Sequence, residues 1–287
     1  MRRRLALTGA VGAAILALGA GAALAAVARS AADPGVTPAA IVLGGTAPLT
    51  GPASSLAAIA RGAEAYFEYV NASGGVLGRK ILYRVVDDGS DPARSAAAAQ
   101  QLVEQDKALA IVSPIGTAAS LAQRAYLNGA GGPQLFAASG ATALARDAAR
   151  FPATIGFQPS YRAEGWVYGT YVARTAPGAR IGVLLQDDED GRALLAGLRQ
   201  GLLRSDARVV ATQAVTPGTA DVQGQVARLK AAGADTLAVF AAPGVTAEAL
   251  VLASKHGWKP ARVIESSLAA GQGALRLAAE RGAGALV

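Results

Sequence analysis

The sequence predicts an α/β fold of two lobes, each a mostly parallel sheet flanked by helices. Three observations carry this prediction. Apolar runs of strand length alternate with helical patterns, which is typical of parallel sheets with right-handed crossovers. The runs are continuously apolar, as expected for strands buried on both faces. The alternation breaks at 151–161, FPATIGFQPSY, which we interpret as the first crossing between lobes spanning 39–156 and 157–287.

Eight strands are expected, at Ile41–Gly44, Ile81–Val86, Leu109–Val112, Gln134–Ala137, Ile181–Leu185, Val209–Thr212, Leu237–Phe240 and Arg262–Glu265. Helices fill the intervals between them. The first helix is expected to bury one stripe of residues spaced three or four apart, namely Leu56, Ile59, Ala63, Phe67 and Val70. The second is expected to begin with Asp91 as N-cap and Pro92 as its first helical residue.

The last residues predict a helix and a strand that belong to an incomplete fold. Gly273–Arg281 predicts a short helix, and the run Ala283–Val287 predicts another strand entering a sheet. A two-lobed fold needs the chain to return to the first lobe. At about 30 residues per βαβ unit, we expect about a hundred further residues, so the sequence suggests C-terminal truncation.

The first 30 residues have the three parts of a secretory signal peptide. Arg2–Arg4 form a basic start, Leu5–Ala28 is uncharged, and Ala23–Ala25 offers a small-x-small cleavage site. An uncleaved anchor is the alternative, because the run is long enough to span a bilayer. We therefore expect export to the periplasm, or attachment to the cell surface if the segment is not cleaved.

The composition excludes several classes of function. The 27 Lys and Arg residues outnumber the 20 acids, but without Arg2, Arg3, Arg4 and Arg29 the formal charge falls from +7 to +3. No basic cluster with interleaved aromatics occurs in the body of the chain, so we expect no nucleic acid partner. The sequence has no cysteine, which excludes disulfides, thiolate metal sites and cysteine nucleophiles.

The sequence gives little support for an enzyme. The run Asp87–Asp91 spells DDxxD, which holds magnesium in other settings, but no second motif of this magnesium-binding type accompanies it and helix capping explains Asp91 better. Asp187–Asp190 is a second acidic loop, and His256, the single histidine, cannot build a zinc site. Neither a nucleophile elbow nor a phosphate-binding glycine motif occurs. We expect no catalytic residue, metal or cofactor, with a metal-dependent enzyme as a minor alternative.

Several motifs together resemble one family. They include Gly44–Pro52, Arg61–Glu64, Asn71–Lys80, Asp87–Pro92, Ile111–Ser120, Ala138–Thr142, Ile181–Gly191, Asp221–Lys230 and Gly233–Asp235. From Ile41 to Val287 the chain is similar to the periplasmic substrate-binding proteins of branched-chain amino-acid ABC transporters, the type I leucine-binding class. The resemblance implies a periplasmic-binding-protein-like type I fold whose two lobes close over an amino acid.

The resemblance also implies ligand-binding residues in loops that follow strands. Thr117 matches a hydroxyl that meets the ligand carboxylate, although a helix N-cap would also explain it. Gly140 and Thr142 match a second cluster, which meets the carboxylate and ammonium groups. Donors at a helix N-terminus suit an anion, and a glycine lets backbone approach a ligand closely.

The second lobe departs from the family pattern. Ala242 and Pro243 stand where an aromatic residue is common, and Asp190 replaces another. A carboxylate expected to pair the ligand ammonium matches near Ser266, with Glu265 adjacent. In the first lobe Leu56 lies where a further aromatic would cover the ligand. Tyr161, at the crossing, is expected to supply part of the missing aromatic surface.

The implied function is capture of a small amino acid, or a related carboxylate or amide, for uptake by an ABC transporter. The implied partners are the small-molecule ligand and a membrane permease, and a monomer is expected. Two alternatives stay open: an anchored ligand-sensing module of the same fold, and a non-functional truncated fragment.

Overall fold

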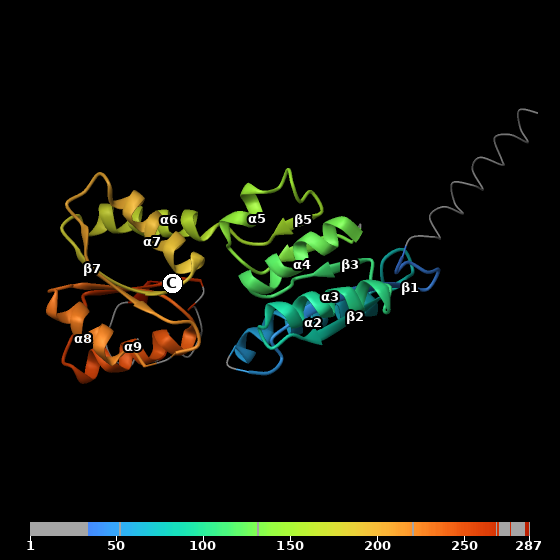
Figure 1. Cartoon of the computed structure of the whole chain (residues 1–287), viewed down its shortest axis with the longest axis horizontal. Helices are drawn as coiled ribbons and strands as arrows, with labels where there is room; N and C mark the ends of the chain where they lie inside the picture. The colour runs from blue at the N-terminus through green and yellow to red at the C-terminus, as the bar shows by residue number, and fades with distance from the viewer. Residues whose placement is uncertain are drawn as a thin grey trace, which may run out of the picture. The chain divides into compact units, whose positions relative to one another are not determined.

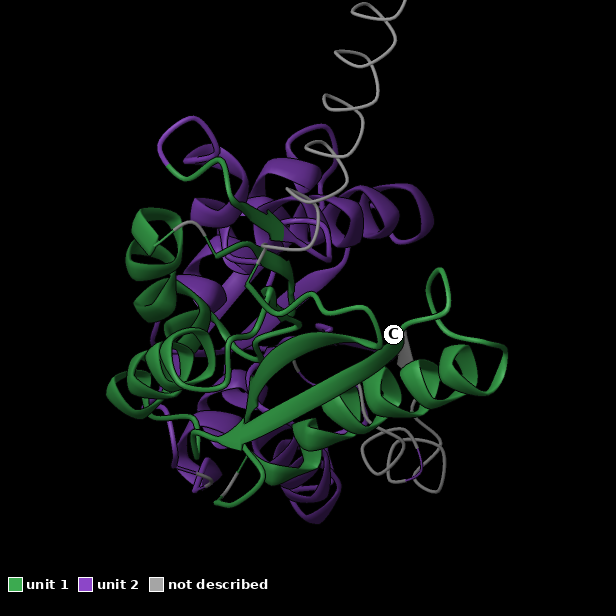
Figure 2. Cartoon of the chain, turned by 90° about the vertical axis from the view of Figure 1, so that its right-hand side faces the viewer, with its two compact units in different colours: residues 1–138, 151–155 green, residues 139–150, 156–287 purple. Residues whose placement is uncertain are grey.

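The computed structural model describes residues 34–51, 53–130, 132–219, 221–267, 269, 276 and 285–286. They form two compact units, shown in different colours in Figure 2: unit 1 runs to Ala138 and includes Phe151–Ile155, and unit 2 comprises Ser139–Arg150 and Gly156 onwards. The proposed signal segment lies outside the described residues, as does the expected helix at 273–281 except for Arg276. The lobe boundary expected after Gly156 stays a prediction.

Unit 1 is a five-stranded sheet in the order β2-β1-β3-β4-β5, with parallel pairing between β2 and β1, β1 and β3, and β3 and β4 (Figure 1). Its strands are β1 (Ala40–Ala47), β2 (Lys80–Asp87), β3 (Ala110–Val112), β4 (Gln134–Ala137) and β5 (Thr154–Gly156). Its helices are η1 (Ser54–Ala57), α2 (Ala58–Ala72), α3 (Pro92–Glu104) and α4 (Thr117–Ala130).

Unit 2 is also a five-stranded sheet, ordered β10-β9-β8-β6-β7, and all its pairings are parallel. The strands are β6 (Arg180–Gln186), β7 (Arg208–Val215), β8 (Thr236–Phe240), β9 (Arg262–Glu265) and β10 (Ala285–Leu286). The helices are α5 (Thr142–Arg146), α6 (Tyr161–Thr175), α7 (Glu189–Leu202), α8 (Gln223–Ala231) and α9 (Pro243–Lys255). One core lies under α8 and α9, the other under α6 and α7.

All eight expected strands are present, and the α/β class with parallel sheets is confirmed. Part of the closing run, Ala285–Leu286, pairs with β9 as expected for an entering strand. The short strand β5 was missed, because its three residues follow Pro152 and carry only one large apolar side chain. The cap of α3 is as predicted: Asp91 accepts a hydrogen bond of 2.8 Å from the backbone N–H of Arg94, and Pro92 follows it.

One burial prediction was wrong, and another was wrong at a single residue. Strand β2 alternates between exposed and half-buried residues rather than being buried on both faces, because it is an edge strand. In α2, Ile59 is 42% exposed and Ala60 is buried instead, whereas Ala63, Phe67 and Val70 are half-buried, as the predicted stripe requires. The residues before α2 form the 3₁₀ turn η1, in which Leu56 is half-buried.

Helices α6 and α7 pack closely in unit 2 (Figure 1). Glycines make this approach possible: a Cβ on Gly165 would lie 2.1 Å from the Leu194 carbonyl oxygen, and one on Gly169 would lie 2.2 Å from that of Leu198. The contact fixes the N-terminal half of α6 against the core. No helix in the part of the chain that is described combines the length and apolar character needed to cross a membrane.

Candidate functional site

Thr117 lies at the carboxyl edge of the unit 1 sheet, where open α/β sheets bind their ligands. The loop before it joins two strands: Ile115 N–H donates to the Thr46 carbonyl (3.3 Å) and Gly116 N–H to that of Ala138 (3.2 Å). Position 116 requires a glycine, because the backbone φ angle there is +95°. Thr117 is then the half-buried first residue of the fourteen-residue helix α4. Both its hydroxyl and the helix N-terminus are suited to an anion.

Asp87 fastens the loop after β1 to this edge. Its carboxylate accepts hydrogen bonds from Leu49 N–H (2.9 Å), Thr50 N–H (3.2 Å), the Thr50 hydroxyl (2.6 Å) and Gly89 N–H (3.0 Å). The Thr50 hydroxyl is the largest cause that lowers the pKa of Asp87 to about 2. Leu56, which stands where an aromatic was expected, packs against the core cluster that contains Ala47 and Ala60.

The DDxxD motif is explained by these local bonds. Asp88 is fully buried and accepts from Ser90 N–H (2.9 Å) and the Ser95 hydroxyl (3.0 Å), while Asp91 caps α3. All three carboxylates therefore have partners within the chain. Among the described residues no group of three or more His, Cys, Asp and Glu side chains could hold a metal ion.

Five of the expected site residues lie in unit 2: Gly140, Thr142, Tyr161, Asp190 and Ser266. Tyr161 N–H donates to the Gly140 carbonyl at 2.7 Å. A Cβ on Gly140 would lie 2.7 Å from the Tyr161 ring, so the glycine is required by this packing. Two residues on, Thr142 is half-buried at the start of α5. The loop 139–142 is thus held against the first turn of α6.

Tyr161 is 2% exposed and belongs to the core under α6 and α7. Burial raises the pKa of its hydroxyl to about 12, and the charges of Asp190 and Glu164 act in the same direction. Within the acidic loop, Asp187 pairs with Arg192 (2.7 Å) and Asp188 caps α7 through Gly191 N–H (2.9 Å). Only Asp190 in this run is turned into the unit, with 9% of its surface exposed.

Two neighbouring polar residues follow at the carboxyl end of β9. Glu265 and Ser266 are both fully buried, and neither the Glu265 carboxylate oxygens nor the Ser266 hydroxyl has a hydrogen-bond partner among the described residues. Burial raises the pKa of Glu265. A carboxylate removed from water without a partner is unfavourable, so such a group is typical of sites that receive a ligand.

Glu164 links this end of β9 to α6. Its carboxylate accepts hydrogen bonds from Ser267 N–H and the Ser267 hydroxyl, both of 2.7 Å, and from the Tyr168 hydroxyl at 2.8 Å. Tyr168 stacks on Phe240, with ring centroids 6.3 Å apart. Burial raises the pKa of Tyr168, and the charges of Glu164 and Glu265 raise it further. Neither glutamate has a Lys or Arg ion-pair partner in the described structure.

The unit 2 site is therefore built from tyrosines and carboxylates gathered around the N-terminal half of α6. It is suited to a ligand group that carries positive charge or donates hydrogen bonds. The sequence did not single out Glu164. The available signal was its place one turn after Tyr161 on the helix that follows the crossing. Ala242 and Pro243 begin α9 and bring no ring to this end of the sheet.

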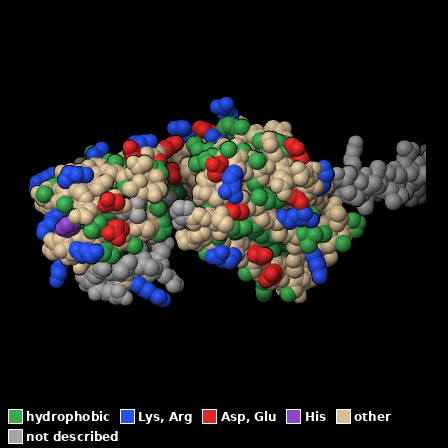
Figure 3. Space-filling view, turned by 60° about the horizontal axis from the view of Figure 1, so that its bottom comes forward, with side chains coloured by type: hydrophobic (Ala, Val, Ile, Leu, Met, Phe, Trp, Pro, Cys, Tyr) green, Lys and Arg blue, Asp and Glu red, His purple; other side chains and the backbone are tan. Residues whose placement is uncertain are grey.

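Charged side chains elsewhere are mixed in sign. On the face shown in Figure 3, basic and acidic side chains are interspersed rather than gathered into one basic area. A nucleic acid surface usually collects Lys and Arg on one face or along one groove. The face in view lacks that footprint.

Comparison with known proteins identifies relatives. Residues 40–287 match the family model described as periplasmic binding protein. A Leu/Ile/Val-binding protein homolog of Brucella melitensis is 28% identical over 199 residues, covering 69% of this chain and 53% of that protein. An amino acid binding protein of Pseudomonas aeruginosa is 27% identical over 207 residues, covering 69% and 52%. The chain thus spans about half the length of the curated relatives it matches.

Solved structures share the fold. The branched-chain amino acid transporter substrate binding protein of Streptococcus pneumoniae, in complex with isoleucine, has a TM-score of 0.74 at 22% identity, covering 84% of this chain and 68% of that one. A fatty acid ABC transporter substrate-binding protein of Thermomonospora curvata has a TM-score of 0.73 at 24% identity, covering 86% and 61%. A solute binding protein of Rhodopseudomonas palustris, in complex with benzoate, has a TM-score of 0.70 at 20% identity, covering 85% and 65%.

Proposed function

This chain belongs to the periplasmic binding protein family, and we propose from that premise that it is an extracytoplasmic solute-binding protein which delivers a small ligand to an ABC permease. The family consists of substrate-binding proteins rather than enzymes, and the curated relatives are described as amino acid or Leu/Ile/Val-binding proteins. Ligand capture, rather than chemistry, is therefore the proposed activity.

The proposed ligand is a small amino acid, or a related compound with an amine. The observation that carries this choice is the fully buried Glu265 carboxylate, which has no hydrogen-bond partner among the described residues and lies beside the buried Ser266 hydroxyl. A ligand ammonium would offset the unfavourable burial of that charge. Thr117, at the start of α4, is proposed to donate to the ligand carboxylate, with Gly140 and Thr142 as the further predicted contacts.

Thermal unfolding with matched ligands tests the proposal. Leucine, its deaminated analogue 4-methylpentanoate and benzoate differ in whether they carry an amine. A bound ligand at a hundred times its Kd stabilises the folded chain by about 2.7 kcal/mol. We expect stabilisation by the amino acid alone, lost in Glu265→Gln and retained in the control Glu248→Gln on α9. Equal stabilisation by the deaminated acids, unaffected by Glu265→Gln, would refute the amine assignment.

Three further features belong to the proposal. Export is proposed from residues 1–30, and N-terminal sequencing of the secreted chain should then begin near Ala26. An uncut N-terminus would favour the anchored sensing module. Ligand-binding lobes at 39–156 and 157–287 and a monomeric state are also proposed. Sedimentation velocity of the secreted chain tests the monomeric state, and no ligand binding by a folded chain would favour the non-functional alternative.

A further inference from the structure

The outer edge of β2 in unit 1 offers a separate surface. Lys80 N–H donates to the Ala39 carbonyl (2.9 Å) and Asp88 N–H to that of Ala47 (3.0 Å), so even-numbered residues of β2 bond toward β1. Because strand residues alternate, Ile81, Tyr83 and Val85 present their backbone N–H and C=O groups outward. No described strand pairs with this edge.

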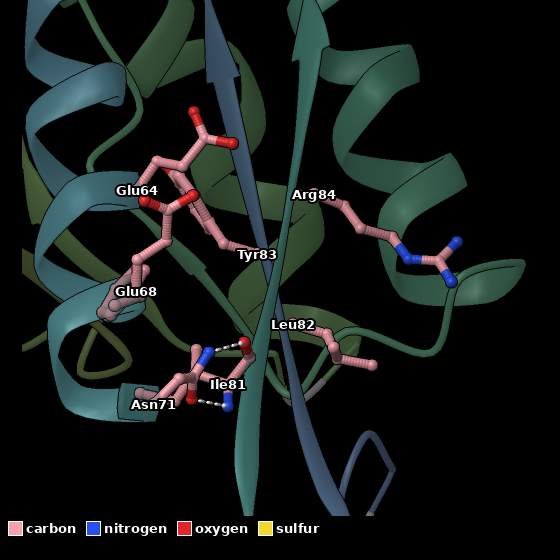
Figure 4. A pocket seen from close by; sticks show the side chains of 8 residues that line it. Glu64, Glu68, Asn71, Ile81, Leu82, Tyr83 and Arg84 are labelled. Carbon is pink, nitrogen blue, oxygen red and sulfur yellow. Dashed lines mark hydrogen bonds between the residues drawn. The ribbon is translucent and has the colours of Figure 1, made fainter. Parts of the chain in front are cut away.

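Asn71 closes one end of the open edge. Its side-chain N–H₂ donates to the Ile81 carbonyl at 2.8 Å, and its side-chain oxygen accepts from Ile81 N–H at 2.7 Å (Figure 4). The amide thereby imitates a neighbouring strand at one position. The backbone groups available for pairing are those of Tyr83 and Val85.

A groove of about 360 Å³ lies beside Tyr83 and is lined by residues of α2 and β2. Figure 4 shows Glu64 and Glu68 on the same side of β2 as Tyr83, with Leu82 and Arg84 on the other side. Phe67 meets Tyr83 edge-on, with ring centroids 5.1 Å apart, and completes the wall of the groove. The two sides of the edge therefore differ in chemistry.

The side toward α2 is negatively charged. Glu64 and Glu68 lie one turn apart, and neither makes an ion pair or hydrogen bond in the described part of the chain. On the opposite side the Arg84 charge is paired with Asp106, and Leu82 leaves 45% of its surface exposed. One side thus attracts basic groups and the other offers apolar contact.

We propose that the β2 edge docks an extended segment of a partner protein, added as a strand beside Tyr83–Val85. Main-chain hydrogen bonds supply the pairing, and alternate side chains supply the selectivity. The segment carries Lys or Arg at every second position, facing Glu64 and Glu68, and apolar residues between them, facing Leu82. All the residues that form this surface lie in unit 1.

The test uses an acetylated hexapeptide of alternating lysine and valine and residue-resolved amide exchange of the whole chain. At ten times its Kd, the peptide should slow exchange of the Tyr83 and Val85 amides about tenfold. The Ile81 amide serves as an internal control, because it already donates a hydrogen bond to the Asn71 side chain. A peptide of the same sequence whose backbone amides are N-methylated should give no protection, since it has no N–H donor to offer the outward carbonyl groups of β2 in either strand direction.

A charge-matched pair of variants separates docking from general attraction. Glu64→Gln/Glu68→Gln should raise the peptide Kd about threefold to tenfold, and Glu189→Gln/Glu248→Gln in unit 2 should leave it unchanged. Equal losses in both double variants, or equal binding of the N-methylated peptide, would overturn the proposal. Protection of Tyr83 and Val85 that grows with protein concentration alone would assign the edge to a second copy of this chain instead.

Discussion

Replacing Gly169 by alanine tests the packing that fixes α6 and its tyrosine–carboxylate site. The added Cβ would lie 2.2 Å from the Leu198 carbonyl oxygen and 2.9 Å from the Gly201 Cα, whereas ordinary contact begins near 3.4 Å. The obstructing atoms are backbone, so no side chain can turn aside. The two helices must separate by about 1 Å or bend.

The expected loss follows from two opposing effects. Overpacking at a buried contact costs about 1–3 kcal/mol, and this clash belongs at the upper end because backbone atoms oppose it. Alanine recovers up to about 1 kcal/mol of helix propensity relative to glycine. We therefore expect a free energy of unfolding about 2 kcal/mol lower than that of the unchanged chain.

Urea unfolding followed by tryptophan fluorescence is the assay, because Trp166 and Trp258 both lie in unit 2. The control is Gly244→Ala in α9 of the same unit, where no heavy atom lies within 4 Å of the added Cβ. It should leave stability unchanged or raise it by up to about 1 kcal/mol. Equal effects of the two substitutions would refute the argument that close backbone approach requires Gly169.

Three other predictions concern single carboxylates. Burial raises the pKa of Glu265 above the ordinary 4.5, so the folded chain holds a proton that the unfolded chain releases, and the free energy of unfolding falls as pH rises above 4.5. In urea unfolding, Glu265→Gln should have the same free energy of unfolding as the unchanged chain near pH 4 and a higher one at pH 7. The pKa of Asp87 is lowered from 3.8 to about 2, so its contribution to stability is present above pH 3.8 and is lost on acidification toward pH 2. Asp87→Asn should speed amide exchange at Leu49 and Thr50 at pH 6, and unchanged exchange rates would contradict the role of Asp87 in holding this loop. Asp91→Ala should lower the free energy of unfolding of unit 1 by about 1 kcal/mol through loss of the α3 cap, whereas Asp91→Asn should retain most of it.

The sequence was sufficient for features that depend on near neighbours. Buried parallel strands produce continuous apolar runs, so β6, β8 and β9 could be located directly. The cap at Asp91 is equally local. Strand β5 and the exposure of Ile59 were not accessible, because β5 has only three residues with one large apolar side chain, and the burial of Ala60 instead of Ile59 depends on what packs against α2.

In the candidate site, too, residues placed by local sequence could be predicted, and residues placed by distant contacts could not. Thr117 could be placed because it starts a helix after a strand, but the role of Glu164 depends on Ser267, which is 103 residues away in sequence. A position-by-position match with a family points to Ser266 and cannot show that its neighbour Glu265 is the buried carboxylate.

The departures in unit 2 are best understood together. An aromatic residue is absent at Ala242, and Asp190 takes the place of another, yet Tyr161 and Tyr168 bring two rings to the same end of the unit from α6. Burial, with a further contribution from the neighbouring carboxylates, raises the pKa of both hydroxyls, so both are protonated hydrogen-bond donors at neutral pH. On our proposal, the aromatic surface of the ligand site comes from α6 rather than from loops, and the close α6–α7 contact holds that helix in place. A site so fixed should discriminate ligands chiefly by charge, which is why the comparison of leucine with its deaminated analogue is more informative than a series of side-chain lengths.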